Sequence, residues 1–254
     1  MASPLFTSFH FLLHRLKSQD AHDLHSPFLF DLYNKVFRSI DRQEEAGLLA
    51  LRKFFENKER IEFLDPKSNE AKASTVASLK NQVASSHRFS YFLVRLIKHL
   101  GYDRILETGT SIGLNAAYLG SVEGLKIWTI EGSIELAACA SRNFRALSID
   151  SINVVQGLVQ EVFGSTLEEA APKIIFLDAD HRSETIRFYL ETIKSKAKNV
   201  DCIVIHDIYW SPDMLNAWKE IVANADYLLT IDVFEAGIIF PNYPMEKQHF
   251  TIRL

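Results

Sequence analysis

The chain has 254 residues, of which 47% are hydrophobic, and its formal net charge is −4 at pH 7. This length suits one large α/β domain with a helical extension, and the acidic balance without a basic stripe argues against nucleic acid as a partner. No apolar run approaches the roughly 18 residues of a membrane span, so we expect no membrane partner. Cys139 and Cys202 are far apart in the sequence, which predicts reduced thiols in a cytoplasmic protein.

Residues 1–84 are predicted to form a helical extension. Apolar residues at helical spacing indicate a first helix: Phe6, Phe9, Leu12, Leu13 and Leu16. Ser26 and Pro27 begin a second helix, because serine caps helices and proline suits their first turn. A charged helix is expected over residues 42–58, and the polar segment 65–74 is expected to be a loop.

The extension also contains four histidines: His10, His14, His22 and His25. The first two share a helix face and the other two belong to another segment, so a solvated or capping role is favoured over metal binding. An aromatic stripe indicates packing against the core or against a second copy of the chain in a homodimer: Phe6, Phe9 and Phe28.

After a helix over residues 90–100 that ends at Gly101, short apolar strands alternate with helices. The expected strands are residues 104–108, 126–131, 152–156, 174–178, 202–206 and 227–232, with the last helix at 213–223. This alternation predicts an α/β, doubly wound, mostly parallel sheet. Two apolar segments follow, residues 237–240 and 249–254, with no room for a crossover helix between them. One of them is therefore expected to run antiparallel, as part of a C-terminal hairpin.

The turn after the first of these strands indicates a cofactor site. Gly109 and Gly113 let the backbone turn sharply and approach a ligand, and the helix that follows begins with unpaired N–H groups. The spacing differs from the dinucleotide-binding G-x-G-x-x-G pattern. Glu131 ends the second strand about 20 residues later, where a carboxylate can accept both ribose hydroxyls; alternatively it is an acid at a helix N-terminus.

A second cluster of polar residues follows the later strands. Asp178, His206 and Asp207 would form an oxygen-rich divalent metal site with one imidazole. In the alternative interpretation, Asp180 caps the next helix and His206 packs against the sheet. His181 has an ordinary pKa near neutrality and is a candidate general base. Tyr209 and Trp210 would stack on a substrate ring or pack in the core.

These motifs resemble those of class I S-adenosylmethionine-dependent methyltransferases over residues 85–254. The resemblance is greatest to small-molecule O-methyltransferases of the catechol O-methyltransferase type and to metal-dependent sugar O-methyltransferases. It implies a Rossmann-like, seven-stranded sheet with an antiparallel last strand. It also implies that residues 1–84 form a lid and that residues 85–254 bind S-adenosylmethionine.

The resemblance assigns roles to individual residues. It places the methionine part of the cofactor on the first motif and near Asn115: Glu107, Gly109, Thr110, Ser111 and Gly113. It places the ribose on Glu131 and the adenine on the turn with Gly157 and Gln160. Asp178 matches a cofactor-side and metal-binding aspartate, and His181 matches the general base. The pair His206–Asp207 matches the end of the metal site, where a carboxylate usually stands in place of His206. This departure favours manganese, iron or zinc over magnesium, or a direct role for His206 without a metal.

The function implied is transfer of a methyl group from S-adenosylmethionine to an oxygen of a small hydroxylated acceptor. Two other classes of function stay open. One is a nicotinamide-dependent oxidoreductase, which the glycine spacing and the C-terminal hairpin disfavour. The other is a non-enzymatic cofactor-binding or interaction protein that retains the fold. A protein acceptor also stays open.

Overall fold

A central eight-stranded sheet organises the molecule. The computed structural model describes residues 3–24, 26–38, 41–65, 68, 70–82, 85–244 and 246–254, so His25 lies outside the described residues. The strand order is β10-β8-β9-β7-β6-β3-β4-β5. The strands are β3 (Arg104–Thr108), β4 (Lys126–Glu131), β5 (Ile152–Gln156), β6 (Ile174–Leu177), β7 (Cys202–His206), β8 (Leu229–Asp232), β9 (Ala236–Phe240) and β10 (Gln248–Thr251).

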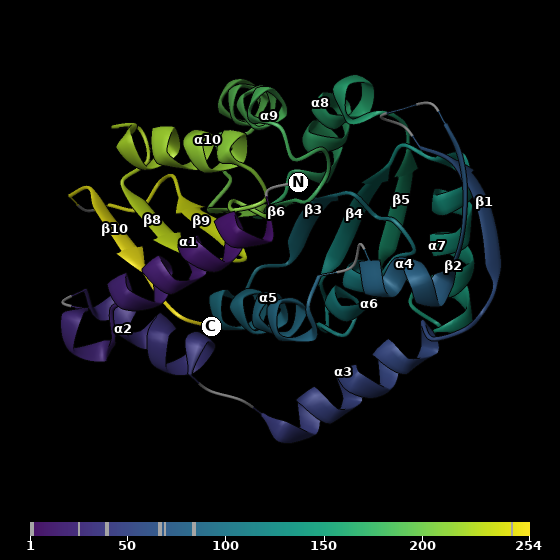
Figure 1. Cartoon of the computed structure of the whole chain (residues 1–254), viewed down its shortest axis with the longest axis horizontal. Coiled ribbons are helices and arrows are strands. Elements are labelled where there is room, and N and C mark those ends of the chain that lie inside the picture. Colours follow the sequence, from purple (N-terminus) through teal and green to yellow (C-terminus); the bar gives the residue numbers. More distant parts are fainter. Residues whose placement is uncertain are drawn as a thin grey trace.

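Helices cover both faces of this sheet, as expected for a doubly wound fold (Figure 1). One face carries α8 (Val159–Ala170), α9 (Ser183–Lys196) and α10 (Pro212–Ala223), and the other carries α5 (His87–Leu100), α6 (Leu114–Leu119) and α7 (Ile134–Ala146). Every residue of β6 and β7 is buried, because parallel strands between two helical layers have no solvent-facing side. Each face of the sheet forms its own apolar cluster with its helices.

The strand order fixes the position of the site. From β3 the chain adds β4 and β5 on one side and then returns to add β6 and β7 on the other. Ligands of open α/β sheets bind beyond the carboxyl ends of the strands where this reversal occurs. Here that place lies beyond Thr108 of β3 and its neighbour Leu177 of β6.

The C-terminal part confirms the antiparallel hairpin and adds one strand. β9 runs antiparallel to both β7 and β8. Because β9 runs in the opposite direction, it ends near the start of β8. β10 can therefore begin there after a short loop and pair parallel with β8 at the edge of the sheet. The sheet thus has eight strands instead of the seven that the resemblance implies.

The N-terminal extension is mainly helical, as predicted, but it also contains a hairpin. Its helices are α1 (Pro4–Lys17), α2 (Pro27–Leu32), α3 (Arg42–Phe54) and α4 (Val76–Gln82), with a 3₁₀ turn at Ala21–Asp23 and a π-helical turn at Tyr33–Phe37. The expectation of a loop over 65–74 is wrong in its second half, because β2 (Ala71–Thr75) pairs antiparallel with β1 (Arg60–Leu64). In β1, the apolar residues Ile61 and Phe63 alternate with charged residues, which is the pattern of a strand. The polar composition of the surrounding segment hid this pattern.

The side chains of α1 are arranged differently from the expectation. His14 is buried, so the predicted solvated or capping role is wrong for this residue. Phe9, Leu12 and Leu16 are instead exposed, whereas Phe28 of α2 packs against Phe240 and Tyr243. Among the described helices, none combines the length and apolar character that a membrane crossing requires.

Candidate active site

The turn between β3 and α6 can be built only with glycine at its key positions. Gly109 and Gly113 have φ angles of 91° and 86°, which side-chain-bearing residues rarely adopt. A Cβ atom on Gly109 would lie 2.7 Å from the carbonyl oxygen of Asp178, and one on Gly113 would lie 2.6 Å from the ring of Phe144. Gly109 therefore holds the turn close to the end of β6, and Gly113 holds it close to α7.

Glu107 supports this turn from below. Its side chain is buried, and its two carboxylate oxygens accept hydrogen bonds from Asn115 Nδ2 (2.7 Å) and Thr129 Oγ1 (2.6 Å). Burial, only partly opposed by these bonds, raises the pKa of Glu107 to about 7. Asn115 Oδ1 is buried without a hydrogen-bond partner among the described residues, although Asn115 lines the adjacent cavity. A buried acceptor of this kind is suited to a ligand donor.

Glu131 faces the turn from the end of β4. Its Oε2 accepts the N–H of Ser111 at 2.7 Å, and its Oε1 accepts the N–H of Ser133 at 2.9 Å. Burial raises the pKa of Glu131, and the backbone N–H groups oppose that rise. Each oxygen keeps a further lone pair, so the carboxylate can still accept two hydroxyls. Glu131 thus bonds the N-terminal end of α7, as one of the two expectations had it, and it also lines the cavity.

A cavity of about 1230 Å³ lies above the carboxyl ends of the strands. Most of the predicted site residues line it: Gly109, Thr110, Ser111, Asn115, Glu131, Gln160, Asp178 and His181. Within the described part of the chain, Glu107, Gly113, Gly157, His206 and Asp207 are not among its lining residues. Gly157 instead packs against α8, since a Cβ atom at this position would lie 2.6 Å from the side chain of Val162.

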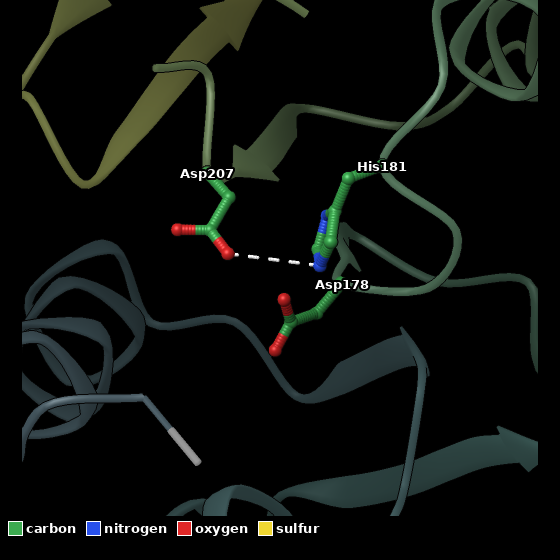
Figure 2. Close-up of side chains that lie close together, drawn as sticks. All are labelled: Asp178, His181 and Asp207. Atoms are coloured by element: carbon green, nitrogen blue, oxygen red, sulfur yellow. Dashed lines mark ion pairs between the residues drawn. The ribbon is translucent and has the colours of Figure 1, made fainter. Parts of the chain in front are cut away.

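Asp178, His181 and Asp207 come together at the ends of β6 and β7 and point toward a common space (Figure 2). Each offers one ligand atom, and these atoms lie within 4.8 Å of one another. His181 Nε2 is 3.6 Å from Asp207 Oδ2. Asp207 has a φ angle of 56°, a left-handed conformation that is uncommon for non-glycine residues. Burial raises the pKa of the Asp207 carboxyl, although the nearby histidines favour its charged form.

His206 lies behind this group. Its Nδ1 is bonded to Asp178 Oδ1 at 2.8 Å, and its ring packs against Phe89 and Phe176. Burial lowers the pKa of His206, but the charges of Asp178, Asp207 and Glu235 outweigh this effect and raise it to about 9. The geometry thus matches the alternative of a histidine packed against the sheet and adds a hydrogen bond to Asp178.

Two other predicted groups are resolved by their contacts. Asp180 is buried and accepts hydrogen bonds from the side chain of Thr185 of α9 and from the guanidinium of Arg182; it is not the cap residue of α9, because the N-cap position is Arg182. Tyr209 packs on Phe234, whereas Trp210 lines the cavity, with its ring 5.2 Å from that of His181.

The sequence did not reveal the residues that cover the cavity from the N-terminal side. Phe63, Asp65 and Lys72 of the β1–β2 hairpin line it, as do Leu79 and Gln82 of α4. The local signal that could have indicated a strand in this segment is the alternation of Ile61 and Phe63 with charged residues. No local pattern places the hairpin over the sheet, because that position results from contacts between β1 and α7.

Comparison with solved structures identifies the fold. A putative O-methyltransferase from Klebsiella pneumoniae is 15% identical with a TM-score of 0.55, and the match covers 91% of this chain and 100% of that one. A putative caffeoyl-CoA O-methyltransferase from Staphylococcus aureus is 14% identical with a TM-score of 0.57, covering 84% of this chain and 96% of the other. An O-methyltransferase from Bacillus cereus, solved in complex with SAH, is 18% identical with a TM-score of 0.53, covering 82% and 93%.

These likenesses show that the chain has the fold of these O-methyltransferases. No family model matches the sequence, and no curated protein matches it.

Proposed function

We propose that the protein is an S-adenosylmethionine-dependent methyltransferase that methylates an oxygen of a small hydroxylated acceptor. The observation that carries this proposal is the pairing of Glu131 with the Gly109–Gly113 turn across one wall of the cavity. A cavity that leads from this pair to His181 accommodates both a nucleoside-type cofactor and an acceptor. The fold supports the proposal, as does the SAH bound to the Bacillus cereus O-methyltransferase that shares it.

The cavity wall fits the cofactor in two respects. Asn115 Oδ1, which has no partner among the described residues, can accept a hydrogen bond from the methionine ammonium group, while the Glu131 carboxylate accepts hydrogen bonds from the ribose hydroxyls. Gly109 lets the turn pack directly on the backbone of Asp178, at the part of the wall where the methionine part would lie. Gln160 extends the same wall toward the adenine position. When bound, the cofactor supplies an electrophilic methyl group, and catalysis by the protein is mainly positioning and exclusion of water.

His181 is the proposed proton acceptor. Its Nε2 lies beside Asp207, whose negative charge stabilises the imidazolium that forms when the ring takes the proton of the acceptor hydroxyl. Trp210 lies against this ring and forms the wall on which a flat acceptor would rest. Asp178 is held by His206 and directs its carboxylate into the same space.

The same group fits a divalent metal ion. Asp178, His181 and Asp207 provide two carboxylates and one imidazole within reach of a single ion, a donor set that suits manganese, iron or zinc. A bound ion would lower the pKa of the acceptor hydroxyl. His206, which was predicted to bind the metal, already uses Nδ1 for a hydrogen bond to Asp178. Its role would therefore be to orient the Asp178 carboxylate. We therefore favour His181 as the nitrogen ligand in a metal-loaded site.

Calorimetric titration of S-adenosylmethionine and S-adenosylhomocysteine, with and without Mn²⁺, tests the proposal. We expect micromolar binding, and we expect Glu131→Ala to weaken it by a factor of about 100, since two hydroxyl–carboxylate bonds are lost. Exposed Glu123 provides a matched control, and Glu123→Ala should bind normally.

His181→Ala should retain the cofactor and lose transfer to acceptors, and also lose Mn²⁺ if the metal is bound. If the wild type binds neither ligand, and the fluorescence of a nicotinamide cofactor changes when it is mixed with the protein, the cavity would be assigned to an oxidoreductase.

We also propose that the protein is a cytoplasmic homodimer that pairs through α1. Cys139 and Cys202 are buried and unpaired, which supports a reducing compartment. The outward face of α1 carries Leu5, Phe9, Leu12 and Leu16, with side chains 82%, 59%, 58% and 74% exposed. Their 4-3-4 spacing is the seam of a two-helix pair. α1 has basic residues only at its C-terminal end, so an antiparallel partner helix keeps these charges apart.

A further inference from the structure

The inner face of α1 meets the sheet through a buried polar network. His14 Nε2 lies 3.2 Å from Oδ1 of Asp232, the last residue of β8. Asp232 Oδ2 accepts a hydrogen bond of 2.7 Å from the hydroxyl of Tyr209. His14 and Asp232 are 3% and 4% exposed. We refer to these three residues as the α1 network.

Aromatic rings enclose the α1 network. Tyr209 and Phe234 stack with their ring centres 4.8 Å apart, and His14 meets Phe234 edge-on at 5.6 Å. His10, one turn earlier in α1, lies 5.6 Å from the Tyr209 ring. Buried polar groups that are enclosed in this way keep one geometry, because any other leaves them without partners. The network therefore fixes Tyr209 relative to α1 and β8.

Tyr209 belongs to the turn that carries two residues of the candidate active site. Trp210 N–H donates to the carbonyl of Asp207 at 2.8 Å, and Asp207 N–H donates to the carbonyl of Glu235 at 2.7 Å. Asp207 and Trp210 approach His181 from this turn. Asp207 is in the left-handed conformation, which persists only where surrounding contacts enforce it. Tyr209, the residue that α1 contacts, is thus the neighbour of Trp210 in this turn and lies two residues after Asp207.

We propose that His14, Asp232 and Tyr209 are positioning residues that set Asp207 and Trp210 against His181. The inference rests on the proposed function only in naming this half of the cavity the acceptor side. It assigns the N-terminal helix to the acceptor side of the site. The cofactor side is built by β3 and β4, which three strands separate from β8 in the sheet order, so the α1 network should act on one side and not the other.

Fluorine NMR of the full chain labelled with fluorotryptophan tests this inference. The three tryptophans are Trp128, Trp210 and Trp218, and Trp210→Phe assigns the signal of interest. Tyr209→Phe, which removes only one hydroxyl, and His14→Leu should each shift or broaden the Trp210 signal. The Trp128 signal on β4 should stay in place. His14→Gln presents an amide N–H where His14 Nε2 lies, and it should restore the wild-type Trp210 signal. Ser8→Ala, at an exposed position of α1 outside the apolar stripe, is the matched control.

Two outcomes would overturn the inference. One is an unchanged Trp210 signal in folded Tyr209→Phe and His14→Leu variants. The other is a His14→Gln variant that shifts the signal as much as His14→Leu, since the bond to Asp232 would then be irrelevant. Binding of S-adenosylhomocysteine, measured in parallel, should stay within about twofold of wild type in all variants, because distant sites act independently. A wild type that fails to bind while Trp210 still responds would overturn the proposed function and leave the positioning role standing.

Discussion

Glu107 combines almost complete burial with an ionisable group. The folded chain raises its pKa to about 7 from an ordinary value of 4.5. An acid with a raised pKa binds its proton more tightly in the folded state, so its stabilising contribution is complete below about pH 4.5 and is lost as the pH rises through about 7. The carboxylate that holds Asn115 in place therefore destabilises the ligand-free protein near neutral pH.

Replacement of Glu107 by glutamine should remove this pH dependence. Glutamine keeps the shape and an acceptor for Asn115 Nδ2 but does not ionise. The free energy of unfolding of Glu107→Gln minus that of the wild type should become more positive between about pH 4.5 and 8, by up to about 3 kcal/mol. Urea unfolding without cofactor at a series of pH values measures this difference. His206 titrates in both proteins, so its contribution cancels in the difference. Parallel profiles of unfolding free energy against pH for the two proteins would contradict the prediction.

Residue types and spacing predicted the turn glycines, Glu131, Asp178 and His181, because each follows directly from a strand end. They could not predict which histidine faces the cavity. His206 is the last residue of β7 and His181 lies four residues after β6. Only the packing of Phe89 and Phe176 around His206 decides that it is enclosed.

The β1–β2 hairpin is the element whose position depends most on tertiary contacts. Its apolar face contributes Phe63 to the cavity, and Leu64 next to it points away and is half exposed. We expect Phe63→Ala to weaken S-adenosylhomocysteine binding by a factor of about 10, mainly through faster dissociation, because the cover over the ligand is lost. Leu64→Ala should leave binding unchanged. Stopped-flow displacement measures the rates, and equal effects of the two substitutions would show that the hairpin is no lid.

The strands of the central sheet were predictable because each is short and has an apolar centre. β3, β4, β5 and β7 begin and end at the expected residues. Elements at the margins were harder to predict. The hairpin is mostly exposed, and its sequence is too polar to indicate a strand by composition. The eighth strand depends on the direction of β9, which no single segment specifies.

At the scale of the whole molecule, the proposed pairing through the outer face of α1 makes a prediction about the oligomeric state. Leu12→Glu places a charge in the middle of the apolar stripe, and we expect it to convert a dimer into a monomer because a buried unpaired charge is costly. Sedimentation equilibrium measures the mass. Ile134→Glu, at an exposed apolar position of α7, is the control and should leave the dimer intact. A wild-type protein that sediments as a monomer would rule out the α1 pair, and binding of that monomer to anionic vesicles would assign the stripe to a lipid surface.

The two ends of the described chain are joined. Just after α1, Gln19 pairs with the strand at the far end of the sequence, where its N–H donates to the carbonyl of Thr251 and its side chain accepts the N–H of Thr251. During synthesis α1 therefore leaves the ribosome long before its partner residue on β8 exists. Its histidines and its apolar stripe stay uncovered for most of translation, and chaperones that bind exposed apolar segments have that interval in which to act. The α1 network can close only after Asp232 has been made, so the arrangement of Asp207 and Trp210 is completed late in synthesis.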